Sequence, residues 1–147
     1  MTREEFIALL KKKRYSCEME GDKIMVTHEG NVDLGLLETL PPGVHFKNDG
    51  DVFLWNLETL PSGVEFKNDG NVSLSGLKSI SSGVHFKNDG YVYLRSLETL
   101  PPSVRFENGG DIYLKGLGWV NRNEGIRIEG VRNKRLLNLM ISKGLFI

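Results

Sequence analysis

A twenty-residue period runs through the chain, and it restricts the possible folds more than any other feature. Four copies follow one another from Gly43 to Arg122, and a weaker copy precedes them from Lys23 to Pro42. A fixed short period is typical of a solenoid, in which each unit buries its apolar side chains against its neighbours. The period therefore predicts a mainly β fold, a parallel β-solenoid of five to six coils.

Within one copy the apolar residues are Val44, Phe46, Val52, Leu54, Leu57 and Leu60. The first four alternate with a period of two, which indicates two short strands, and the last three, spaced by three, indicate a bent or 3₁₀-like third side. An antiparallel hairpin around Asn48-Asp49-Gly50 would also fit this alternation. Stacking is favoured because a unit this short cannot bury six large apolar side chains alone. Two internal ladders are then expected, Phe46-Phe66-Phe86-Phe106 and Leu54-Leu74-Leu94-Leu114.

Turn residues separate the two strands of each copy. The turn glycine recurs in every copy, at positions 30, 50, 70, 90 and 110, whereas the glycine that opens a copy is replaced in some of them. The constancy of the turn glycine predicts a backbone angle that only glycine adopts cheaply.

The repeats are flanked by two segments that we expect to cover the solenoid ends, because open sheet edges invite aggregation. Residues 1–22 are predicted to be a helical cap and connector, with Thr2 and Glu5 as a capping box. Residues 23–122 are the repeat solenoid. Residues 123–147 are predicted to form a last strand and a helical cap, ending in the apolar Leu145, Phe146 and Ile147. This tail either packs on the final coil or forms a homodimer contact.

Composition narrows the class of function. The formal net charge is zero, which makes nucleic acid a less favoured partner, and the single cysteine rules out an intramolecular disulfide. No segment resembles a signal peptide or a membrane span. We therefore expect a cytoplasmic protein, of the source or of a host cell. No nucleophile elbow, phosphate loop or zinc spacing is present, so we expect no enzyme activity, no catalytic residue, no metal and no cofactor.

The consensus Leu-x-x-Leu-x-x-Leu-Pro-x-Gly-Val-x-Phe-x-Asn-x-Gly-x-Val-x-Leu resembles short leucine-rich-repeat-like solenoid proteins of bacteria and phages. It is carried by Leu54, Leu57, Leu60, Pro61, Gly63, Val64, Phe66, Asn68, Gly70, Val72 and Leu74 and by their equivalents. Ordinary leucine-rich repeats have longer units and place the asparagine after the leucine strand. The resemblance implies a recognition scaffold, such as a phage- or mobile-element-type inhibitor of a host protein.

Charged residues recur in columns that have structural explanations. His45, Glu65, His85 and Arg105 would form one outward column in which neighbouring charges complement each other. The two histidines would lie too far apart to bind one metal ion directly. The lysines at positions 47, 67 and 87 are expected to form surface ion pairs with the aspartates two residues later. The asparagines at 48, 68, 88 and 108 are expected to bond turn backbone along the stack.

The outward positions that differ between copies are the candidate binding site. They contain aromatic and basic residues of the types enriched at interface hot spots, namely Phe53, Trp55, Tyr91, Tyr93, Arg95, Tyr113 and Lys115. Binding of another protein through these residues is the leading hypothesis, and simple stabilisation of the sheet is the alternative. The small Ser73 and Ser75 interrupt this surface.

Two further functions stay open. A basic C-terminal zone beside Tyr93 and Tyr113 would suit nucleic acid; it contains Arg95, Lys115, Arg122, Arg127, Arg132, Lys134 and Arg135. A structural or self-assembling repeat protein would use the solenoid ends and the tail.

Overall fold

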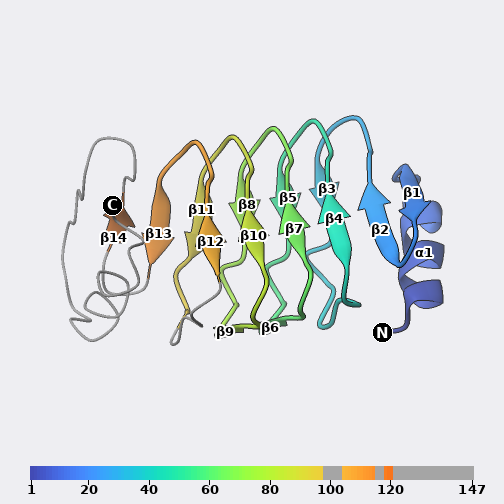
Figure 1. The fold of residues 1–147 in the computed structure, drawn as a ribbon, viewed down its shortest axis with the longest axis horizontal. Coiled ribbons are helices and arrows are strands. Elements are labelled where there is room, and N and C mark those ends of the chain that lie inside the picture. The colour runs from blue at the N-terminus through green and yellow to red at the C-terminus, as the bar shows by residue number, and fades with distance from the viewer. Residues whose placement is uncertain (98–103, 115–117, 121–147) are drawn as a thin grey trace.

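The computed structural model describes residues 1–97, 104–114 and 118–120. Figure 1 shows a parallel β-solenoid of about four turns, preceded by one short helix. Sheet A contains, in spatial order, β1 (Cys17–Glu20), β2 (Lys23–Val26), β4 (Val44–Phe46), β7 (Glu65–Phe66), β10 (His85–Phe86) and β12 (Arg105–Phe106). Sheet B contains β3 (Val32–Asp33), β5 (Val52–Phe53), β8 (Val72–Ser73), β11 (Val92–Leu94), β13 (Ile112–Leu114) and β14 (Gly118–Val120).

The strands of successive coils pair in parallel with a constant offset of one repeat. His45 pairs with Glu65 and Glu65 with His85 in sheet A, and Val52 pairs with Val72 in sheet B. This register confirms the solenoid and excludes the hairpin around Asn48-Asp49-Gly50.

In the described residues the number of coils, about four, is smaller than the five to six expected. The fifth copy contributes β12 and β13, but the chain then turns back, and β14 pairs with β13 in the antiparallel direction, with Tyr113 opposite Trp119. Residues 118–120 therefore do not form the third side of another parallel coil. The predicted cap at 123–147, including its last strand and helix, lies outside the described residues.

The core consists of ladders of identical residues. The rings of Phe46, Phe66, Phe86 and Phe106 are stacked nearly parallel, with successive centroids 5.2, 5.1 and 4.9 Å apart. Leu54, Leu74 and Leu94 are fully buried in the second expected ladder. Each unit buries its apolar side chains against the equivalent side chains of the next unit, which a single copy cannot do alone.

The third side has less strand structure, and a proline explains where pairing is lost. Its only described pairing joins β6 (Thr59–Leu60) to β9 (Ser79–Ile80), and the backbone N–H of Ser81 donates to the Leu60 carbonyl at 3.0 Å. Pro61 occupies the position equivalent to Ser81 one coil earlier and has no N–H to donate to Leu40. Thr39 and Leu40 accordingly form no strand pairing with Thr59 and Leu60, although the Gly43 backbone N–H donates to the Ser62 carbonyl at 3.3 Å just beyond them.

The turn glycines are required for a reason other than the one predicted. Among the five, only Gly30 has a positive φ, whereas Gly43, Gly63 and Gly83, which open their copies, have φ of 76–82°. A Cβ on Gly50 would overlap the Asn31 side chain and lie 2.7 Å from the Gly30 carbonyl carbon. Close approach of adjacent coils, not a special angle, therefore excludes a side chain at most turn glycines.

Helix α1 (Arg3–Lys12) and strand β1 cover the N-terminal end (Figure 1). Thr2 caps the helix by accepting the Glu5 backbone N–H, as predicted, and Phe6 and Leu10 are fully buried. β1 adds to sheet A in the antiparallel direction. The edge strand of sheet B is covered by Tyr15, whose hydroxyl accepts the backbone N–H of Asp33 at 3.0 Å.

Candidate binding face

The outer surface of sheet B carries most of the predicted binding residues. The register places Asp33, Phe53, Ser73, Tyr93 and Tyr113 in one column, one residue per coil. Their neighbours in the sequence, Val52 and Val92 among them, point inward and are fully buried. We call this surface the aromatic face; it consists of the column above and the flanking positions 51/71/91 and 35/55/75/95. The predicted juxtaposition of Phe53, Tyr93 and Tyr113 is confirmed.

Trp55 is held over a glycine at the N-terminal end of the face. A Cβ on Gly35 would lie 2.9 Å from the indole Cζ3 of Trp55 and would overlap Cε3, so the indole occupies the space above Gly35. Phe53 supports the indole from the side, with ring centroids 5.1 Å apart and planes tilted by 35°. Trp55 nevertheless remains 46% exposed. The indole is thus positioned by packing while much of its surface faces solvent.

A second aromatic cluster lies two coils further on. The rings of Tyr91 and Tyr93 meet edge to face with centroids 6.4 Å apart, and Tyr91 is 43% exposed. The guanidinium carbon of Arg95 lies 5.7 Å from the ring centroid of Tyr113, within the range of a cation–π interaction. Arg95 thus presents a positive charge at this end of the face.

The serines between the clusters do not leave a polar gap at the centre. Ser73, whose register neighbours are Phe53 and Tyr93, is only 9% exposed, although it points outward. The two larger side chains therefore cover it. The Ser73 and Ser75 hydroxyls lie 3.5 Å apart, and the Ser96 hydroxyl donates to the Ser75 carbonyl at 2.6 Å.

A hydrogen-bond ladder that the sequence analysis did not identify borders the face. Asn31 Oδ1 accepts the backbone N–H of Asp51 at 2.8 Å, and Asp51 Oδ1 accepts that of Asn71 at 2.7 Å. Asn71 Oδ1 accepts the backbone N–H of Tyr91 at 2.8 Å. Tyr91 has a ring carbon at the γ position, so it cannot repeat this bond, and Asp111 follows it in the next coil. The exposed Tyr91 therefore replaces an Asn or Asp that would extend the ladder.

Two residues near the face were not identified from the sequence. Leu36 is 87% exposed at the corner beside Gly35, where the other copies have Asn56, Gly76, Ser96 and Gly116. The alignment of copies contained this signal, because a single leucine stands in a polar or glycine column. Trp119 is placed opposite Tyr113 by the register of β14, which no repeat pattern predicts.

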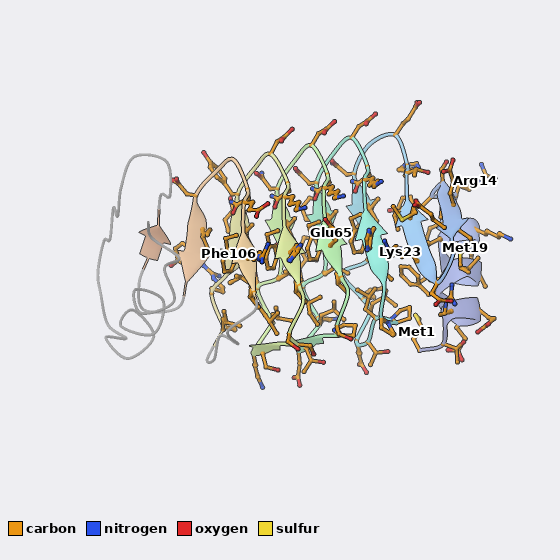
Figure 2. All side chains as sticks on the ribbon, in the orientation of Figure 1. Met1, Arg14, Met19, Lys23, Glu65 and Phe106 are labelled. Atoms are coloured by element: carbon orange, nitrogen blue, oxygen red, sulfur yellow. The ribbon has the colours of Figure 1, made fainter. Side chains whose placement is uncertain are left out.

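The opposite sheet carries the predicted column of His45, Glu65, His85 and Arg105. Figure 2 labels Glu65 in this sheet. Glu65 Oε1 lies 3.3 Å from Lys67 Nζ and 3.4 Å from Lys87 Nζ, and Oε2 lies 3.4 Å from His45 Nδ1. The ion pairs predicted between the lysines and the turn aspartates are wrong: Lys67 shares the outward face of its strand with Glu65, whereas Asp69 lies beyond the corner.

Burial and charge act in opposite directions at this cluster. Burial alone would raise the pKa of Glu65, but the hydrogen bond and charge of Lys67, with His45 and Lys87, hold that pKa below its usual value. For His45, burial lowers the pKa below 6.5; the charge of Glu65 acts in the opposite direction, and the positive charges of Lys23, Lys67 and Lys47 add to the lowering. His45 is therefore neutral at pH 7, so its contact with Glu65 is not an ion pair. No group of three metal-ligating side chains is placed to hold an ion in the described part of the chain.

The asparagine ladder in the turns is confirmed. Asn68 Nδ2 donates to the Gly50 carbonyl of the preceding coil at 3.0 Å, and Asn48, Asn88 and Asn108 make equivalent bonds. All four side chains are buried, so they belong to the scaffold.

Some predicted residues lie outside the described ranges. They include Lys115, the rest of the basic C-terminal zone beyond Arg95, and the tail Leu145–Ile147. In the residues that the structure describes, no helix is long and apolar enough to cross a bilayer.

Comparisons with protein-family models, curated proteins and solved structures gave no match. The case for function thus comes from the geometry of the face.

Proposed function

We propose that the chain is a non-enzymatic scaffold that binds another protein through the aromatic face. The observation that carries this proposal is Tyr91. At this position the scaffold favours a side-chain oxygen, because Asn31, Asp51 and Asn71 each use one to bond the next coil. A tyrosine there cannot accept that backbone N–H, and it leaves an aromatic ring 43% exposed beside Tyr93, a surface suited to binding a partner.

Leu36 and Trp55 support the same proposal at the other end of the face. Both are large apolar residues with high exposure, and they lie in columns where other copies carry smaller or polar residues. Exposed apolar residues that gather on one surface mark interaction sites more often than scattered ones do. Binding itself would be the activity, for example inhibition of a host protein in the cytoplasm of the source or host cell.

The test uses a triple variant, Phe53→Ser, Trp55→Ser and Tyr93→Ser, and a matched control, Lys47→Ser, Asp49→Ser and Asp69→Ser, on exposed positions outside the face. Partners captured by the native chain from the source or host cell are purified and their affinities measured by calorimetry. We expect the face variant to lose at least about tenfold in affinity, or about 1.4 kcal/mol, and the control to retain it. Equal affinities for a folded face variant would show that the aromatic residues only stabilise the sheet.

A further inference from the structure

The corner between the first and second coils adjoins the aromatic face and differs from the rest of the third side. Because Pro61 cannot donate a backbone hydrogen bond, Thr39–Leu40 does not pair with Thr59–Leu60 as β6 pairs with β9. A surface hollow lies on these two coils, and its lining residues are Glu38, Thr39, Asn56, Glu58 and Thr59. We call this hollow, with the adjacent Leu36 and Trp55, the acidic corner.

The lining of the hollow offers oxygen acceptors and two carboxylates. Within the described residues, Glu38 forms no ion pair, and Glu58 Oε1 lies 3.7 Å from Lys78 Nζ, both side chains being well exposed. The N-terminal ammonium of Met1 donates to Thr39 Oγ1 at 3.1 Å. On the adjoining aromatic face, Asp33 Oδ1 accepts the Gly35 backbone N–H at 3.0 Å, beside the Trp55 indole. The carboxylates of Glu38, Glu58 and Asp33 thus lie at or beside the corner, together with two cations, the Met1 ammonium and Lys78.

The apolar part of the acidic corner is exposed, so a docked segment could contact these apolar residues and the hollow together. Leu36 is the most exposed large apolar residue described, at 87%. Trp55 is 46% exposed, whereas its neighbour Leu54 is fully buried. Trp55 directly precedes Asn56, which lines the hollow. Lysine and arginine match this combination, because their apolar stems pack on hydrophobic surface while their charged ends reach polar groups.

We propose that the partner segment docked at the acidic corner is basic and apolar. A lysine or arginine of the partner enters the hollow between Glu38 and Glu58, and a neighbouring aliphatic or aromatic side chain covers Leu36 and Trp55. The cation also lies near the exposed indole, whose face attracts positive charge. This inference rests on the proposed function, and it specifies the partner's chemistry at one end of the aromatic face. Arg95 at the other end would disfavour a basic segment there, so charge would also set the docking orientation.

The test is a selection of random peptides displayed on phage against the immobilised full chain, followed by measurement of the affinities of the enriched peptides as synthetic probes. We expect enriched peptides to carry lysine or arginine beside an apolar residue. Glu38→Lys with Glu58→Lys should weaken them at least about tenfold. The matched control, Glu29→Lys with Asp49→Lys, makes the same change of net charge at another corner and should leave the affinities within about twofold.

The outcomes separate this inference from the proposed function. Enriched peptides that lack a basic residue, or that bind the Glu38/Glu58 variant as well as the native chain but lose affinity on the Phe53/Trp55/Tyr93 variant, would overturn the inference and leave the aromatic face as a binding site. Peptides that bind both variants like the native chain would overturn both. If peptides are enriched no more on the native chain than on the Phe53/Trp55/Tyr93 variant, this result would also contradict both the inference and the proposed function. Thermal unfolding of each variant verifies that it is folded.

Discussion

The Oδ1 atom of Asn71 accepts the backbone N–H of Tyr91 at 2.8 Å, and with this bond the side-chain ladder that began at Asn31 reaches a residue unable to continue it. A hydrogen bond of this kind contributes about 1 kcal/mol. Tyr91 instead makes an edge contact with Tyr93 and leaves its ring 43% exposed. Variants of Tyr91 can therefore separate the contribution of this residue to stability from its contribution to binding.

Tyr91→Asn should weaken partner binding while the fold keeps its stability. The asparagine can accept the Asp111 backbone N–H, gaining about 1 kcal/mol, and this offsets the loss of the edge contact with Tyr93, also about 1 kcal/mol. We expect the free energy of unfolding, measured in urea, to stay within about 1 kcal/mol of the native value. Affinity for the purified partner should fall at least about tenfold.

Tyr91→Phe is the matched control, because it keeps the ring and cannot form the ladder bond. It should retain most of the affinity. If Tyr91→Asn lost several kcal/mol of stability, or bound the partner as tightly as the native chain, the tyrosine would be a structural residue.

The architecture could be predicted from the repeat because its period brings identical side chains into contact. The stacked phenylalanines and the buried asparagines follow from that single geometric rule. The ladder of Asn31, Asp51 and Asn71 was visible as a column of Asn and Asp, but its role depends on an atom-level contact between coils. Its interruption at Tyr91 has meaning only once those contacts are known.

Other features could not be predicted because they depend on single residues that break the period. Ser81 in place of a proline allows β6 and β9 to pair, and Pro61 prevents the same pairing one coil earlier. The reversal of β14 ends the parallel stacking at a point where the repeat alignment continues to Arg122. Leu36 was recognisable as an exception in its column, but only its exposure identifies it as part of a binding surface.

Gly35→Ala should displace Trp55 without straining the backbone. The φ of Gly35 is outside the left-handed region, so alanine fits the backbone, but its Cβ would collide with the indole. We expect a shift in the fluorescence of Trp55, measured in a Trp119→Phe background, and at least about a fivefold loss of affinity if the held indole is a hot spot. Ser82→Ala, at an exposed position outside the aromatic face, should change neither quantity. An unchanged Trp55 spectrum in Gly35→Ala would show that the indole is not held there.

Asn68→Asp should strongly destabilise the solenoid. Asn68 is fully buried, and its Nδ2 donates to the carbonyls of Gly50 and Asn71 at 3.0 and 3.2 Å. An aspartate would face two carbonyl oxygens with an acceptor, at a cost of about 3 kcal/mol or more. Asp69→Asn reverses the substitution at the next, exposed residue and should change stability by less than about 0.5 kcal/mol. Similar urea midpoints for the two variants would contradict the assigned role of the ladder.

Acidification should destabilise the protein in two steps that originate at His45 and Glu65. The pKa of His45 is lowered below 6.5, so between that lowered pKa and 6.5 the unfolded chain binds more protons than the native one. The His45 contribution is therefore complete above pH 6.5 and declines below it. The pKa of Glu65 is lowered below 4.5, so its contribution is present above pH 4.5 and is lost as the pH falls through the lowered native pKa.

Two single variants distinguish these steps when the free energy of unfolding is measured from pH 3 to pH 8. His45→Gln should flatten the profile between the lowered pKa of His45 and pH 6.5 and leave the lower step. Glu65→Gln should reduce the lower step and also lower stability at pH 7, because it leaves Lys67 and Lys87 without their shared carboxylate. A native profile that rises on acidification below pH 6.5 would require His45 to be charged and paired with Glu65, the opposite of what its burial among lysines dictates.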